Sequence, residues 1–182
     1  MISWDNFTGF FRTGIPIEVL VISLLVAFLV ATIGMFCKQV ADKKNFVLWV
    51  LLIEYLFVVM CSTIIFRGEQ SFAYAKLELV PFWTYWAVIK HIPGVSIWDI
   101  ILNVVMFMPL GLLVTLLFPR ITWWKMLIVA MVVSIVIETN QYFFEKGISQ
   151  IDDVMHNSIG AIFGWMFAKG CIRITNKCKS RL

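Results

Sequence analysis

The chain alternates long apolar runs with short polar connections. An α-helix needs about 20 residues to cross the ~30 Å hydrocarbon core of a bilayer. Five runs are close to that length: residues 15–37, 46–66, 100–118, 126–144 and 154–174. The pattern therefore predicts an all-α, polytopic membrane helix bundle of about five spans, whose two termini lie on opposite sides of the membrane.

The composition supports this prediction. Of the 182 residues, 61% are hydrophobic and 14% are charged, whereas a soluble domain is about a quarter charged and less than half apolar. A soluble globule of ~180 residues leaves roughly a third of its surface exposed, which is too much to hide this many apolar groups. A soluble enzyme, a disordered chain and a nucleic-acid-binding module are therefore excluded. The four cysteines show no paired spacing, which argues against metal or redox chemistry through sulfur.

Basic residues are distributed unevenly between the two sides that five spans define. The N-terminal segment and the connections 67–99 and 145–153 carry five Lys and Arg residues, and the other side carries ten. Because short basic segments stay in the cytoplasm, we predict that the N-terminus lies outside and the C-terminus is cytoplasmic. Most acidic residues of the connections fall on the predicted outer side.

The longest connection, 67–99, joins the second and third spans and is rich in aromatic residues. Such a density of aromatic side chains is typical of the headgroup level of a membrane. Residues 82–92 are therefore predicted to form an interfacial helix on the outer face. Two interpretations stay open: a membrane-surface anchor, or a lid that contacts a lipid or a lipid-linked substrate.

Polar residues within the last three spans gather at one depth. At the helical rise of 1.5 Å per residue, Glu138 lies ~9 Å below the outer end of its span, and Asn103 and Asn157 lie ~5 Å below theirs. Ionisable groups inside a span are costly and are functional candidates for that reason. This shallow outer layer is therefore the predicted location of function.

Helical spacing sorts the polar residues of this layer onto faces. Asp99 and Asn103 share one face of the third span, and two longer stripes follow in the chain. The first has Ser134, Glu138, Gln141 and Glu145, and the second has Asp153, Asn157, Gly160 and Gly164. Small residues permit the close approach of another helix, so the second stripe is predicted to pack against the third or fourth span. Polar stripes that face one another would form a pocket open to the outside.

Three interpretations of this layer follow from its residue types: a substrate-binding pocket, a structural network of hydrogen bonds between helices, or a catalytic site. In a catalytic site, Glu138, Asp152 and Asp153 would be the acid–base groups. Together with His156 they also carry donor atoms suited to a divalent metal. A metal is not favoured, however, and no cofactor is expected, because a lone histidine such as His156 is more typical of a helix interface.

Two charged residues outside this layer are also notable. Arg67, at the outer end of the second span, is suited to bind a phosphate or to pair with Glu138 or Asp152. Glu54 lies near the middle of the second span, where we favour a contact between helices over a proton path.

Three ordered blocks of the sequence resemble the VanZ-like family: Asn103-Val-Val-Met-Phe107-Met-Pro109-Leu-Gly111, Glu138-Thr-Asn-Gln141 and Asp152-Asp153-Val-Met-His-Asn157-Ser-Ile-Gly160. Arg67 and the stretch Leu79-Val-Pro81-Phe82 fit the same pattern. The resemblance covers residues 46–170, which we interpret as the family domain. Residues 1–45 then form an additional span with its cytoplasmic loop, and 171–182 form a basic cytoplasmic tail.

The resemblance implies a multi-pass protein of the cytoplasmic (inner) membrane of a bacterium, with a role in the cell envelope. The founding member of the family is associated with resistance to teicoplanin, a glycopeptide antibiotic. Our first hypothesis is an outward-facing pocket that binds a membrane lipid, a lipid-linked cell-wall precursor or the lipophilic antibiotic. The substrate-binding residues would be Arg67, Asn103, Gln141, His156 and Asn157.

Two other hypotheses belong to different classes. The second is an integral membrane enzyme, a hydrolase or transferase, that acts on a lipid-linked headgroup with Glu138 and Asp152/Asp153. The third is a small transporter or a structural bundle without a ligand.

Overall fold

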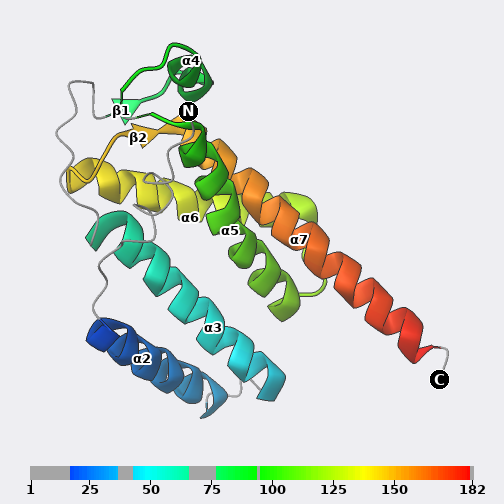
Figure 1. Cartoon of the computed structure of the whole chain (residues 1–182). Coiled ribbons are helices and arrows are strands. Elements are labelled where there is room, and N and C mark those ends of the chain that lie inside the picture. Colours follow the sequence, from blue (N-terminus) through cyan, green and yellow to red (C-terminus); the bar gives the residue numbers. More distant parts are fainter. Residues whose placement is uncertain (1–16, 37–42, 66–76, 94, 181–182) are drawn as a thin grey trace.

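The structure is a computed structural model that describes residues 17–36, 43–65, 77–93 and 95–180. It is built from helices, with two very short strands at one end of the bundle (Figure 1). In chain order the elements are α2 (Ile17–Phe36), α3 (Lys43–Met60), the π-helix η1 (Cys61–Ile65), β1 (Leu77–Glu78), α4 (Trp83–Ile89), α5 (Ile97–Leu117), α6 (Trp123–Phe143), β2 (Ser149–Gln150) and α7 (Ile151–Lys179).

Each of the five predicted apolar runs corresponds to a helix: α2, α3 with η1, α5, α6 and α7. Over the described residues, three stretches are long and apolar enough to cross a membrane, Asn45–Ile64, Ile97–Leu117 and Trp123–Phe143. A shorter apolar stretch, Val19–Thr32, lies in α2. α7 is not among the three, because polar and charged residues occupy both of its ends. The chain is thus a membrane protein with at least these three apolar helices.

The last three helices begin about three residues earlier than the apolar runs predict. α5 starts at a capping box, in which the Ser96 hydroxyl accepts a hydrogen bond from the Trp98 amide and Asp99 accepts one from the Ser96 amide. α7 starts with Asp152 and Asp153 in its first turn, where carboxylates interact favourably with the helix dipole. In α5 and α7, polar residues of the first turn therefore extend the helix beyond the part that suits hydrocarbon.

The closest packing in the bundle is between α5 and α7, which run side by side (Figure 1). A Cβ atom added at Gly160 would lie 2.0 Å from the Val104 carbonyl oxygen, and one at Gly164 would lie 2.0 Å from that of Met108. Only glycine permits such an approach of two backbones. The prediction that this stripe packs against the third or fourth span is confirmed.

Single polar contacts join the remaining helices. The Tyr55 hydroxyl of α3 donates to the Met106 carbonyl oxygen of α5 at 2.6 Å. α2 packs on α3 at the edge of the bundle (Figure 1), and the Ser23 hydroxyl donates to Glu54 Oε1 at 2.8 Å. The predicted role of Glu54 in a contact between helices is therefore confirmed. Cys61 is fully buried in this region, as expected of a packing residue.

One end of the bundle carries β1, β2 and α4, and we call it the α4 end (Figure 1). β1 pairs with β2 in parallel, with Leu77 opposite Ser149 and Glu78 opposite Gln150. This pairing, which the all-α prediction did not include, joins the long connection before α5 to the short connection before α7. The predicted helix 82–92 is present as α4 and ends at Ile89. The two connections predicted to share one side of the membrane do lie at the same end.

Candidate functional site

The polar stripes of α5, α6 and α7 meet near the α4 end, as the helical spacing predicts. The Asn103 amide of α5 donates to Asp153 Oδ1 of α7 at 2.7 Å. The Asn157 amide of α7 donates to the Ser134 hydroxyl of α6 at 2.8 Å. Asn157 and Ser134 are fully buried, so this layer is an internal network of hydrogen bonds that joins three helices.

Asp152 binds the backbone of α4. One carboxylate oxygen accepts from the Phe82 amide at 2.7 Å and the other from the Thr84 amide at 2.8 Å. Phe82 has a left-handed φ of 66°, and its side chain does not cap the helix. The first amides of a helix lack intrahelical partners, and charge-assisted hydrogen bonds to a carboxylate are strong. Asp152, which is 1% exposed, therefore fixes the start of α4 from another helix.

Two further contacts hold α4 on the start of α7. The Thr84 hydroxyl donates to Gln150 Oε1 at 2.8 Å. The Tyr85 hydroxyl and His156 Nε2 share a hydrogen bond of 2.9 Å, and their rings meet edge to face. Thr84, Tyr85 and Gln150 were not among the predicted site residues. No local pattern indicates them, because each has a partner about 70 residues away in the chain.

Asp153, His156 and Tyr85 form a line of polar groups. Asp153 Oδ1 lies 4.0 Å from His156 Nδ1, on the opposite side of the imidazole from Tyr85. The histidine is 2% exposed and lies at an interface between α4 and α7. The structure brings together a carboxylate, an imidazole and a phenol, which are groups capable of acid–base chemistry.

Glu138 and Gln141 of α6 contact two neighbouring parts of the chain. Glu138 Oε2 accepts from the Gln150 amide at 2.9 Å, at the start of α7. The Gln141 side-chain amide donates to the Thr63 carbonyl oxygen of η1 at 3.3 Å. The predicted stripe on α6 stops at Gln141. Glu145 is not helical, because α6 ends at Phe143 and Glu145 has a φ of 56° in the following turn.

Arg67 lies outside the described residues. Among the described residues, no group of three or more His, Cys, Asp and Glu side chains is arranged to hold a metal ion.

Three buried polar atoms of the layer have no hydrogen-bond partner within the described part of the chain: Gln141 Oε1, His156 Nδ1 and Asn157 Oδ1. Buried polar atoms are usually bonded to protein or ordered water, so the network retains capacity for further contacts.

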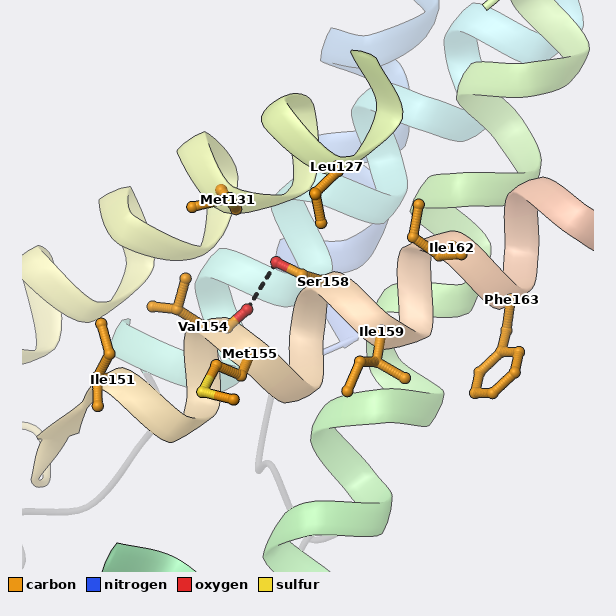
Figure 2. A pocket seen from close by; sticks show the side chains of 9 residues that line it. All are labelled: Leu127, Met131, Ile151, Val154, Met155, Ser158, Ile159, Ile162 and Phe163. Atoms are coloured by element: carbon orange, nitrogen blue, oxygen red, sulfur yellow. Dashed lines mark hydrogen bonds between the residues drawn. The ribbon is translucent and has the colours of Figure 1, made fainter. Parts of the chain in front are cut away.

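A separate apolar groove lies between α6 and α7 (Figure 2). It has a volume of about 410 Å³, and all but one of the residues that line it are apolar. The exception is Ser158, whose hydroxyl donates to the Val154 carbonyl oxygen of its own helix at 2.7 Å. The lining residues are Leu127, Met131, Ile151, Val154, Met155, Ser158, Ile159, Ile162 and Phe163. The predicted polar residues do not line this groove.

A model of the VanZ/LLP1 family matches residues 46–173. The chain belongs to the VanZ/LLP1 family. The match begins in α3 and ends within α7, so it includes the polar network, α4 and the groove, whereas α2 precedes it. The predicted resemblance to this family is confirmed. No curated protein and no solved structure shows significant similarity to the chain.

Proposed function

We propose that this VanZ-type membrane protein acts in the cell envelope of a bacterium and lowers susceptibility to teicoplanin-type glycopeptides. It would span the cytoplasmic membrane five times, with its N-terminus outside and its C-terminus in the cytoplasm. The α4 end would then face outward. There it would bind a lipid-linked envelope component or the lipophilic antibiotic and reduce the contact of the antibiotic with its target.

The observation that carries this proposal is the way α4 is held. Asp152 fixes the start of α4, yet Phe82, Trp86 and Ile89 remain 59%, 53% and 72% exposed. An exposed apolar patch beside a polar network is typical of a surface that meets a lipid or another partner. Aromatic side chains favour the headgroup level. A rigid aromatic surface at that level is suited to contact an amphiphilic ligand.

The first test is drug susceptibility of the host. Deletion of the gene is expected to raise sensitivity to an acylated glycopeptide more than to a glycopeptide without an acyl chain. The wild-type gene should restore resistance, whereas Asp152→Ala and Trp86→Ala should not. Ile174→Ala, at an exposed position far along α7, is the matched control and should restore it. Unchanged sensitivity on deletion would contradict the proposal.

The line of Asp153, His156 and Tyr85 favours a second candidate, an integral membrane enzyme that acts on a lipid-linked headgroup. In this case His156 would accept the Tyr85 hydroxyl proton, and Asp153 would stabilise the imidazolium. Asp152 is less suited to acid–base work, because both of its oxygens accept backbone amides. Purified protein should then turn over a lipid-linked substrate, and Tyr85→Phe and His156→Gln should both abolish turnover.

A further inference from the structure

We propose that the groove between α6 and α7 binds one acyl chain of a phospholipid, from the leaflet that adjoins the α4 end. This inference does not depend on the role in antibiotic susceptibility. It depends on the chemistry, the length and the polarity of the groove.

The lining selects a hydrocarbon ligand. Met131, Ile159 and Phe163 are partly exposed along the groove, and the Ser158 hydroxyl is already bonded to its own helix. A polar ligand would therefore find no group to replace its hydration. α6 is one of the helices apolar enough to cross a membrane, so the solvent around the groove is lipid hydrocarbon.

The length matches one leaflet. Ile151 and Phe163 mark the two ends of the lining on α7 and are twelve positions apart, which is ~18 Å at the helical rise. Half of a ~30 Å hydrocarbon core is ~15 Å. An extended chain advances ~1.2 Å per bond, so the groove accommodates about fifteen bonds. This length suits a common acyl chain and would hold only part of the polyprenyl chain of a cell-wall precursor.

The polarity of the surroundings orients such a ligand. Ile151 follows Gln150, whose amide donates to Glu138, so this polar contact lies at the α4 end of the groove. From there α7 carries the apolar lining away from the α4 end (Figure 2). The polar headgroup of a lipid would lie at the α4 end, and its chain would extend toward Phe163.

Binding at this site depends on shape. A chain that moves from the bilayer into the groove leaves one apolar environment for another, so no hydrophobic driving force favours the transfer. Affinity arises from van der Waals contacts with the lining, which are lost wherever a gap remains. We therefore expect selectivity by chain length and a strong effect of side chains that fill the groove.

Phospholipids with a photoactivatable group at a defined chain position test this directly on the full chain in nanodiscs. A group near the carboxyl end should crosslink to Ile151 and Met155, and a group near the methyl end to Phe163 and Leu127. Met131→Trp and Ile159→Trp should each lower the yield about tenfold. Val132→Trp, one residue from Met131 but outside the lining, should leave the yield unchanged. A circular dichroism spectrum of each variant checks its helicity.

Three results would overturn the inference. Crosslinks spread evenly over lipid-facing positions such as Val132 and Val136 would mean that the groove has no resident chain. Crosslinks from groove residues to a second copy, with a dimer in native mass spectrometry, would assign the groove to self-association. Crosslinking by an acylated glycopeptide but not by a phospholipid would assign it to the antibiotic. Because host susceptibility is measured separately, failure here leaves the proposed function standing.

Discussion

The two faces of α7 differ in how they meet their neighbours. The face toward α5 has glycines whose backbone touches the backbone of the other helix, and polar side chains bonded across the contact. The face toward the groove has larger apolar side chains that leave about 410 Å³ open beside α6. The first face fixes how α5 and α7 align, because the glycine contacts and the bond between Asn103 and Asp153 both require this register. The second leaves open space beside its apolar side chains and is therefore suited to a ligand.

The first prediction concerns the closely packed face of α7 toward α5. Gly160→Ala places a methyl group 2.0 Å from the Val104 carbonyl oxygen, and a backbone atom cannot move aside as a flexible side chain can. We expect a loss of about 4 kcal/mol or the absence of folded protein. Thermal unfolding in detergent, followed by circular dichroism, measures the change.

Gly170 is the matched control for this prediction, since a Cβ atom there meets nothing within 4 Å. Gly170→Ala should preserve stability or raise it by up to about 1 kcal/mol, because alanine is the better helix former. Equal effects of the two substitutions would show that α5 and α7 do not approach each other closely at Gly160.

The second prediction releases α4 from α7. Asp152→Ala leaves the Phe82 and Thr84 amides without their carboxylate acceptor, and an unsatisfied buried amide costs about 1–3 kcal/mol. We expect a loss of about 3 kcal/mol, with faster hydrogen exchange confined to α4. Asp152→Asn retains one acceptor oxygen and should give an intermediate loss. Unchanged exchange in α4 would rule out this anchoring role.

The sequence was sufficient to predict contacts set by helical spacing. Asn103, Ser134 and Asn157 lie on predicted faces, and these faces meet. The sequence did not allow us to predict which residues hold α4. Asp152 and Thr84 are separated by 68 positions, and no local pattern relates them.

The groove escaped prediction for a different reason. Its lining is apolar, and so are the side chains on the lipid-facing surface of the same helices. A hydropathy pattern does not distinguish a face that packs loosely against a neighbour from one that meets only lipid. Glu145 shows a different failure. The spacing predicted that it continues the stripe on α6, but spacing alone does not reveal that the helix has already ended at Phe143.

The third prediction concerns the hydrogen bond between Tyr85 and His156. Tyr85→Phe removes the hydroxyl but keeps the ring that packs on the imidazole, so we expect a loss of about 1 kcal/mol. A double-mutant cycle with His156→Leu should give a coupling energy of similar size. Additive losses would mean that the two side chains do not interact, and would remove the acid–base line on which the enzyme hypothesis depends.

The last prediction compares a serine bonded across the contact between α6 and α7 with a serine that lines the groove between the same two helices. The Ser134 hydroxyl accepts from Asn157 of another helix, whereas the Ser158 hydroxyl bonds to Val154 of its own helix. Ser134→Ala leaves a buried amide without an acceptor and should cost about 1–2 kcal/mol. Ser158→Ala leaves no group unsatisfied across the contact, so its effect should stay within about 0.5 kcal/mol. If Ser158→Ala proved as damaging as Ser134→Ala, the groove face would be part of the assembling core, and its lining would be a poor candidate for an acyl-chain site.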